Sequence, residues 1–228
     1  DRSRGLGDVY KRQTILTFAA SVWGMNDVTH LGIYDIPMMS NIPNLVYLAP
    51  TTYEEYIAML DWSTEQREHP VAIRVPGAVI HGEKPTKDYG ILNKYETVQK
   101  GSGAAIIALG TFFGMGKQAA ELIEKKTGVK PTLINPVYIT GIDEELLESL
   151  KKDHKAVVTL EDGILDGGFG EKITRFYGDS DMRTVNFGLK KEFLDRYDAN
   201  EVLRQNCLTP EQIADLSLIH ISEPTRPI

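Results

Sequence analysis

The sequence T-I-L-T-F-A-A at residues 14–20, followed by G-M-N-D-V-T-H-L-G-I-Y-D at residues 24–35, decides the fold prediction. The first run is short, apolar and rich in strand-forming residues, and the second packs polar and ionisable groups between two glycines. A strand that ends in such a loop is typical of open α/β sheets, which bind ligands in the crevice at their strand ends. His30 and its neighbours in this loop are therefore candidate site residues.

Strand-like and helix-like patterns alternate along the rest of the chain. This alternation predicts an α/β protein with a mostly parallel sheet that is flanked by helices. The predicted strands lie at residues 14–20, 45–49, 71–75, 104–109, 132–134, 156–160 and 183–186. The predicted helices are one capped by Thr51 or Thr52 that runs through residue 66, those at residues 116–126, 143–152 and 171–177, and a final one opened by Thr209 with Pro210 in its first turn.

A polar stretch at residues 76–88, P-G-A-V-I-H-G-E-K-P-T-K-D, interrupts this pattern. Pro and Gly within it favour turns and loops over regular structure, so the stretch is interpreted as a linker. It separates a first predicted unit at residues 14–89 from a second one at residues 90–215.

The two ends of the chain resemble translated sequencing adapters. Residues 3–13 and 216–226 can be back-translated into DNA strings that are reverse complements of each other over nearly their whole length. We therefore expect residues 1–13 and 216–228 to be adapter-derived tails, and exclude them from the fold prediction. The natural segment is expected to be a piece of a longer protein, with exposed sheet edges that favour association.

Composition excludes several classes of function. The 228 residues include 25 Lys and Arg against 32 Asp and Glu, a net charge of −7, so a basic surface for nucleic acid is not expected. The single cysteine, Cys207, excludes an internal disulfide and fits a reducing compartment such as the cytoplasm. No apolar run approaches the length of a membrane span, so no membrane insertion is expected.

Several ordered motifs resemble one enzyme family. Residues 24–35 (G-x-N-D-V-T-H-x-G-x-x-D), 42–44 (I-P-N), 48–55 (L-A-P-T-T-Y-E-E) and 72–76 (A-I-R-V-P) are similar to the pyrimidine-binding domain of thiamine diphosphate enzymes of the transketolase group. V-T-L-E-D-G-I-L-D-G-G-F-G and N-F-G-L-K-K-E-F-L-D-R-Y, at residues 158–170 and 186–197, resemble the carboxy-terminal domain of that group. Within it, the chain is most similar to the 1-deoxy-D-xylulose-5-phosphate synthase family. Agreement of several motifs in order is more specific than any single one.

The resemblance implies a transferase that uses thiamine diphosphate and Mg²⁺ and acts as a homodimer. The implied substrates are pyruvate and an aldehyde phosphate, glyceraldehyde 3-phosphate, and the product would serve isoprenoid and thiamine biosynthesis. The family's main cofactor ligands, a glutamate beside the aminopyrimidine and a G-D-G…N motif, are expected upstream of residue 14, so the fragment is expected to be inactive alone. His30 is the expected catalytic residue, because an imidazole can hydrogen-bond a carbonyl and move a proton. The expected substrate-binding residues are Asn26, Asp27 and Arg74.

The chain departs from the family pattern at several site positions. Asn26 stands where the synthases have Asp, and Asp27 stands where they have Gly, so Asp27 either caps the loop or binds substrate hydroxyls. Ala19 and Gly77 occupy positions of phosphate-binding arginines, and neither can make the paired charge-assisted bonds of a guanidinium. Either residues upstream bind the phosphate or the acceptor differs. Arg74 has the alternative role of a salt bridge to a neighbouring acid.

Other interpretations remain open at this point. The parent could be transketolase itself, a separate carboxy-terminal transketolase subunit or, more distantly, the β subunit of a 2-oxo acid dehydrogenase. A non-catalytic dimerisation or regulatory module is an alternative of a different class. Within the second unit, the glycines at residues 167–170 either bind an anion or, as we favour, permit close backbone packing. Glu161 and Asp162 end a predicted strand and are expected in a solvated or interface role.

Overall fold

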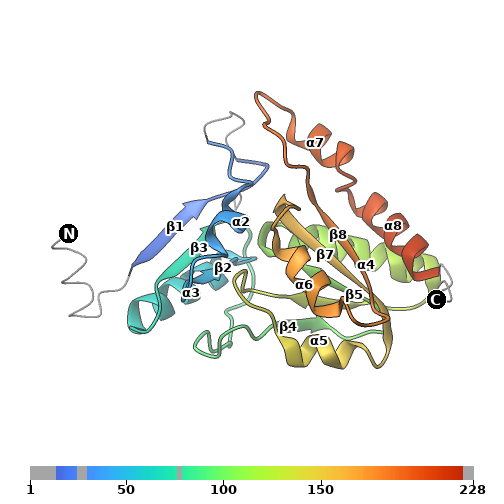
Figure 1. The fold of residues 1–228 in the computed structure, drawn as a ribbon, viewed down its shortest axis with the longest axis horizontal. Helices are drawn as coiled ribbons and strands as arrows, with labels where there is room; N and C mark the ends of the chain where they lie inside the picture. The colour runs from blue at the N-terminus through green and yellow to red at the C-terminus, as the bar shows by residue number, and fades with distance from the viewer. Residues whose placement is uncertain (1–13, 25–29, 76–78, 223–228) are drawn as a thin grey trace.

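The computed structural model describes residues 14–24, 30–75 and 79–222, which form two α/β units packed against each other (Figure 1). The first unit contains a three-stranded sheet in the order β1-β3-β2, and the second contains a five-stranded sheet in the order β4-β6-β5-β7-β8. The predicted α/β class is confirmed. Within the described residues, no helix is both long and apolar enough to cross a bilayer.

The first sheet is parallel throughout. Its strands are β1 (Ile15–Ala19), β2 (Val46–Leu48) and β3 (Val71–Val75), and its helices are the short α2 (Asp35–Met39) and α3 (Tyr53–Glu65). Thr52 caps α3, because its side chain accepts a hydrogen bond from the backbone N–H of Glu55, as the sequence predicts. Strand β1 lies at the edge of the sheet, and Leu16 within it is 47% exposed. The predicted exposed edge is therefore present, and association through it stays a prediction.

The second sheet has one antiparallel edge strand and four parallel strands. Strand β4 (Glu96–Gln99) runs antiparallel to β6 (Thr132–Asn135), whereas β5 (Gly103–Ala108), β7 (His154–Ile164) and β8 (Arg183–Leu189) are parallel to their neighbours. The helices of this unit are η1 (Gly110–Phe112), α4 (Phe113–Thr127), α5 (Glu144–Leu150), α6 (Phe169–Tyr177), α7 (Ala199–Gln205) and α8 (Pro210–Ser222).

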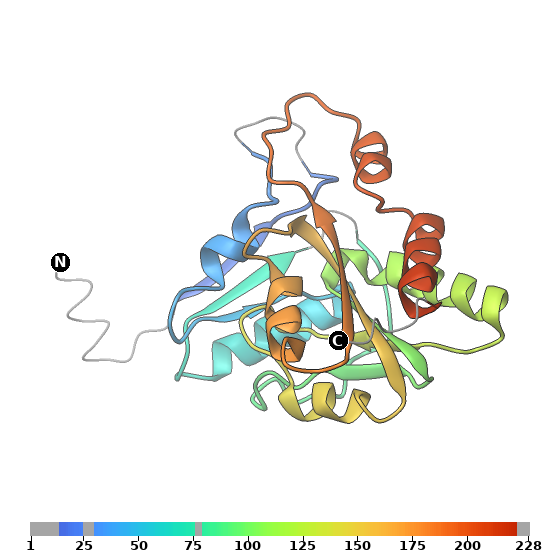
Figure 2. The same cartoon turned by 45° about the vertical axis from the view of Figure 1, so that its right-hand side comes forward.

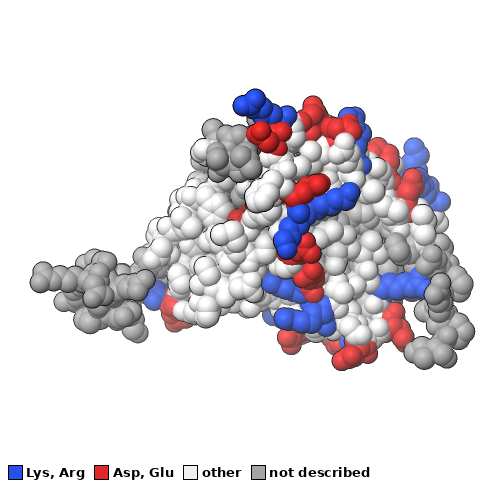
Figure 3. Space-filling view, turned by 45° about the horizontal axis from the view of Figure 1, so that its top comes forward, with Lys and Arg blue, Asp and Glu red and all other residues white. Residues whose placement is uncertain are grey.

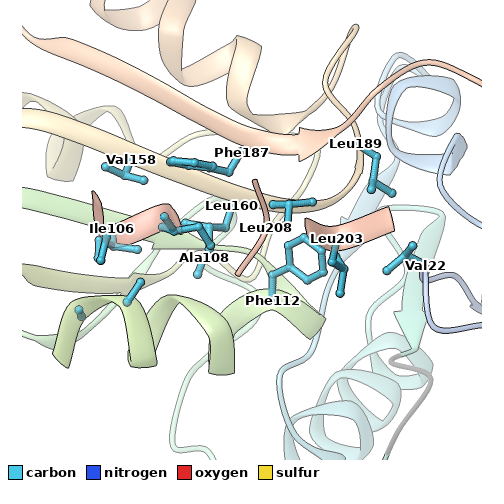
Figure 4. Close-up of a cluster of buried hydrophobic side chains, with 14 of the residues drawn as sticks. Val22, Ile106, Ala108, Phe112, Val158, Leu160, Phe187, Leu189, Leu203 and Leu208 are labelled. Atoms are coloured by element: carbon cyan, nitrogen blue, oxygen red, sulfur yellow. The ribbon is translucent and has the colours of Figure 1, made fainter. Parts of the chain in front are cut away.

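Helices cover both faces of the second sheet (Figures 1 and 2). Alternate residues of β5 and β7 point to opposite faces, so Ile106 and Val158 pack toward α4 and α8, whereas Ile107 and Val157 pack toward α5 and α6. The core between the second sheet and helices α4 and α8 also contains Val22, from the loop after β1. Val22 lies near Phe112, Leu189 and Leu203 (Figure 4). Part of the candidate site loop is thus built into the core of the second unit.

The two units are also joined through β2 and the chain after β6. The backbone N–H of Ala49 donates to the carbonyl of Val137, and the N–H of Ile139 donates to the carbonyl of Tyr47, each over 2.8 Å. Tyr138, which lies between these two bonds, is fully buried. The units therefore form one continuous interior, although the boundary at residue 89 stays a prediction.

Several elements differ from the sequence prediction. The pattern does not predict α2, β4 or α7, which are short, and β4 is an edge strand with alternating partial exposure. Strand β7 continues to Ile164, four residues beyond the predicted end. Helix α8 continues through Ser222, past residue 215, while the proposed adapter origin of residues 216–228 stays a prediction.

Candidate functional site

The loop that carries His30 leaves β1 and returns to the interior before α2. Val22 on one side of it is 1% exposed and Ile33 on the other side is fully buried, whereas His30 itself is exposed. The structure therefore places an exposed histidine between two buried anchors. The predicted substrate-binding residues Asn26 and Asp27, and also Gly77, lie outside the described residues.

Arg74 lies at the centre of a buried network behind this loop. Its Nε donates to Asp35 Oδ2 at 2.8 Å and its Nη2 donates to the carbonyl of Gly32 at 3.0 Å, and the residue is only 4% exposed. The Tyr47 hydroxyl donates a short hydrogen bond to the same Asp35 oxygen. Sequence reasoning missed Tyr47, whereas Asp35 is the last residue of the quoted loop motif.

Asp162 approaches the network from the second unit. Its Oδ1 accepts a hydrogen bond from the backbone N–H of Val22 at 2.9 Å, and its Oδ2 lies 3.9 Å from Arg74 Nη1. The backbone carbonyl of Asp162 accepts a short bond from Arg74 Nη2. Two units that are distant in sequence thus meet at one guanidinium.

The pKa values of the ionisable residues in this network depend on burial and on the charges of their neighbours. Burial by itself lowers the pKa of Arg74, but the carboxylates of Asp35 and Asp162 outweigh it and raise the pKa above the usual value, so the guanidinium stays charged. Burial raises the pKa of Asp162, although the positive charge of Arg74 opposes the shift. Burial also raises the pKa of Tyr47, and the adjacent Asp35 adds to this, so the phenol stays protonated and can donate.

Arg74 has the surroundings of a structural arginine. The salt bridge to a neighbouring acid, which the sequence kept open, is present with Asp35. Its donors point to Asp35, Gly32 and Asp162, all within the protein. A direct contact between Arg74 and substrate stays a prediction.

The close packing around Glu161 accounts for the glycines at residues 168 and 170. Its carboxylate accepts hydrogen bonds from the N–H groups of Phe169, at 2.7 Å, and Gly170, at 2.8 Å, at the start of α6. A Cβ on Gly168 would lie 2.5 Å from Glu161 Oε2, and a Cβ on Gly170 would lie 2.5 Å from Thr159 Oγ1. Close packing therefore requires these glycines, and the anion at this helix N-terminus is the protein's own carboxylate.

Of the solvated or interface role expected for Glu161 and Asp162, the solvated alternative is wrong, because both residues are fully buried, and the interface alternative stays a prediction. Burial raises the pKa of Glu161 to about 7, while the hydrogen bonds from Gly170 and Phe169 act in the opposite direction. The error arises because the predicted strand ends at residue 160, whereas β7 continues through both acids in the interior of the sheet.

A polar groove of about 570 Å³ is lined in part by residues of α6. Lys172 lines it, and its Nζ donates to the carbonyl of Ile139 at 2.6 Å; burial lowers the pKa of this lysine to about 8. The other lining residues of the groove are Ser40, Asn41, Thr140, Gly167, Gly168, Glu171, Thr174, Arg175 and Asn186.

On the face shown in Figure 3, acidic and basic side chains are interspersed, with no extended basic surface.

Comparisons with known sequences show which proteins the chain is similar to. The family model described as the transketolase C-terminal domain matches residues 93–213. Curated relatives named 1-deoxy-D-xylulose-5-phosphate synthase are 31% identical in Clostridium tetani and 33% identical in Clostridium perfringens. These alignments cover 91% and 88% of this chain but 34% and 33% of the relatives. The chain thus spans about a third of the length of these curated relatives.

Solved transketolase structures share the fold of this chain. One described as a split gene transketolase, inactive beta4 tetramer, has a TM-score of 0.75 at 21% identity and covers 91% of this chain and 66% of that chain. A transketolase mutant from Pichia stipitis has a TM-score of 0.69 at 17% identity, covering 96% and 32%. The matched family model spans more than half of the residues, and it shows that the chain belongs to the transketolase C-terminal domain family.

Proposed function

We propose that the chain is the carboxy-terminal part of a thiamine diphosphate-dependent transferase of the 1-deoxy-D-xylulose-5-phosphate synthase type. The parent enzyme would join pyruvate, after its decarboxylation, to glyceraldehyde 3-phosphate, and would release CO₂ and deoxyxylulose 5-phosphate. The observation that carries this proposal is the similarity to curated synthases, which extends over about nine tenths of the chain and so includes the His30 loop as well as the carboxy-terminal domain.

His30 is the proposed catalytic residue. Its exposed position between the buried anchors Val22 and Ile33 leaves the imidazole accessible to a ligand while its backbone is held at both sides. An imidazole there can hydrogen-bond the carbonyl or hydroxyl of a substrate and transfer a proton. Asn26 and Asp27 remain the proposed substrate-binding residues. For Arg74, whose donors are engaged within the protein, we favour a structural role over the predicted contact with substrate.

Following the family resemblance, we propose that the main ligands of thiamine diphosphate and Mg²⁺ lie in the preceding part of the parent protein, and we expect this chain to be inactive alone. Among the described residues, no group of three or more His, Cys, Asp or Glu side chains could hold a metal ion. When bound, the cofactor would supply the carbanion chemistry, and the chain would contribute the substrate side of the site.

The acceptor phosphate needs a positively charged partner, which the described positions Ala19 and Arg74 do not offer. Ala19 is exposed at the end of β1 and offers no charge, and the Arg74 guanidinium is buried beside Asp35. We propose that residues preceding this chain in the parent bind the phosphate. A different aldehyde acceptor is the alternative.

A separate carboxy-terminal transketolase subunit is the second candidate. It is favoured by the split gene transketolase structure, of which this chain covers 66%, against about a third of the synthases. In that case the chain would contribute its part of the site to a transketolase assembled from separate subunits. The uninterrupted genomic sequence distinguishes the two: a G-D-G…N motif and a cofactor glutamate upstream of residue 14 in the same reading frame are expected for the synthase.

A chimaera tests the proposed activity directly. The carboxy-terminal third of the Clostridium tetani synthase is replaced with residues 14–215, and deoxyxylulose 5-phosphate formation is measured with pyruvate and glyceraldehyde 3-phosphate. Substitution of His30 by Ala is expected to lower kcat by about 10² to 10⁴, the usual contribution of a general acid or base. His81, an exposed histidine paired with Glu54, provides the matched control, and His81→Ala should leave kcat unchanged. A folded, cofactor-bound chimaera that decarboxylates pyruvate without forming this product would overturn the acceptor assignment.

A further inference from the structure

We propose that Arg74 and Asp162 are positioning residues for His30, holding the two flanks of its loop from different units of the fold. The flanks are residues 20–24, which follow β1, and residues 31–35, which lead into α2. This inference rests on the proposed function, because it assigns positioning to the residue proposed to act in catalysis.

The first flank is held by the second unit. The Val22 N–H donates to Asp162 Oδ1 at 2.9 Å, and the Val22 carbonyl accepts a hydrogen bond from the Tyr197 hydroxyl at 2.8 Å. The Val22 side chain is 1% exposed within the core shared with α7 and β8. The backbone N–H and the carbonyl of Val22 are therefore hydrogen-bonded to side chains that lie 140 and 175 positions away in the sequence.

The second flank is held from β3 and β7. Arg74 Nη2 donates to the Gly32 carbonyl at 3.0 Å, and the Ile164 N–H donates to the Ile33 carbonyl at 3.0 Å. Asp35 at the end of this flank accepts from Arg74 Nε. The loop is thus bound on both sides by residues of β3 and β7.

Arg74 and Asp162 connect the two flanks to each other. Their side chains are 3.9 Å apart at closest charged atoms, and both are almost completely shielded from water, so the attraction is little screened. Substitution of Arg74 leaves a buried charge without its partner, and substitution of Asp162 leaves a buried charge and a buried N–H without theirs. Because His30 lies between the flanks, a change at Asp162 should reach the imidazole through the loop.

The neighbouring acid provides a matched control. Glu161 is as deeply buried as Asp162, but its carboxylate accepts hydrogen bonds from the N–H groups of Phe169 and Gly170 at the start of α6, whereas Asp162 accepts one from Val22. Substitutions at the two positions have similar burial but act on different segments. They separate loop positioning from a general loss of stability.

The experiment uses the full chain and measures amide hydrogen exchange together with the NMR signals of histidine side chains. In Asp162→Ala, exchange at Val22 and its neighbours is expected to rise about tenfold, and the His30 signal should shift, because a buried hydrogen bond is lost. In Glu161→Gln, the change should appear in the first turn of α6, with the His30 signal unmoved. Should Asp162→Ala fail to fold, Asp162→Asn removes the charge and is expected to give a smaller change in the same direction.

Two results would overturn the inference. One is a folded Asp162 variant with unchanged exchange in both flanks and an unchanged His30 signal. The other is an equal response of the loop to Glu161→Gln. A loop that responds as expected in the chain, combined with an inactive chimaera that folds and binds its cofactor, would instead overturn the proposed function alone. In an active chimaera, Asp162→Ala should lower kcat about tenfold and leave KM for pyruvate within about twofold, because positioning acts on the reacting geometry.

Discussion

Glu161 and Asp162 are consecutive, fully buried residues of β7, and their carboxylates accept hydrogen bonds on opposite faces of the second sheet. Glu161 accepts the N–H groups at the start of α6, and Asp162 accepts the N–H of Val22 in the site loop. Successive side chains of a strand point to opposite faces, so one dipeptide can serve two segments. This relationship connects the α6 helix start and the His30 loop to the same strand.

Removal of the Arg74 charge is expected to destabilise the fold strongly. Arg74→Met keeps most of the volume but leaves Asp35 and Asp162 buried without their counterion, so the free energy of unfolding should fall by about 3 to 5 kcal/mol. Urea denaturation measures the change. Arg204→Met, which removes an exposed pair with Glu201, should have no measurable effect. An Arg74 variant as stable as the control would contradict the buried network.

Glu161 should make stability depend on pH. Its folded-state pKa of about 7 lies above the ordinary value of 4.5, because burial disfavours the charged form. The folded protein therefore holds this proton more tightly than the unfolded chain does. The resulting stabilisation is complete below about pH 4.5 and is lost as the pH rises through about 7.

Glu161→Gln, which cannot titrate, isolates this contribution. Denaturation of both proteins is measured from about pH 5 to about pH 8, and the stability of the native chain relative to the variant should decrease across this range. A difference that stays constant or increases with pH would show that the raised pKa is wrong.

Gly170 and Gly114 should respond oppositely to the same substitution. A Cβ on Gly170 would lie 2.5 Å from Thr159 Oγ1 and 2.8 Å from Asn186 Cγ, so Gly170→Ala should cost about 1 to 3 kcal/mol. Gly114 lies in α4 with no atom within 4 Å of an added Cβ, so Gly114→Ala should stabilise by about 0.5 to 1 kcal/mol. Thermal unfolding compares the two, and stabilisation by Gly170→Ala would argue against the close packing.

The Tyr47 hydroxyl should contribute measurably to the loop network. Tyr47→Phe leaves the buried ring in place and removes the donor to Asp35, so stability should fall by about 2 kcal/mol, the usual value for a bond to a charged group. Tyr53→Phe is the control, because Tyr53 is 46% exposed. Chemical denaturation that finds equal effects for the two variants would exclude a role for this hydrogen bond.

The sequence predicted the elements whose signals are local. Strand β3 was predicted at its observed bounds, Val71–Val75, because a short β-branched run is recognisable by itself. The Thr52 cap of α3 and the close packing of the glycines at residues 167–170 were also predictable, since side-chain capping and a missing Cβ have fixed chemical consequences. Helix α7 and edge strand β4 were missed, because short segments carry too little periodicity.

The sequence by itself determined the α/β class, the transketolase resemblance and the choice of His30, all of which depend on residue types at short spacings. Only the tertiary structure decided which partners Arg74 and Asp162 take. The bond between Val22 and Asp162 joins positions 140 residues apart, and it exists because β7 continues into the interior and the loop after β1 docks against it. Burial of a charge depends on how units pack together, and no local pattern records that packing.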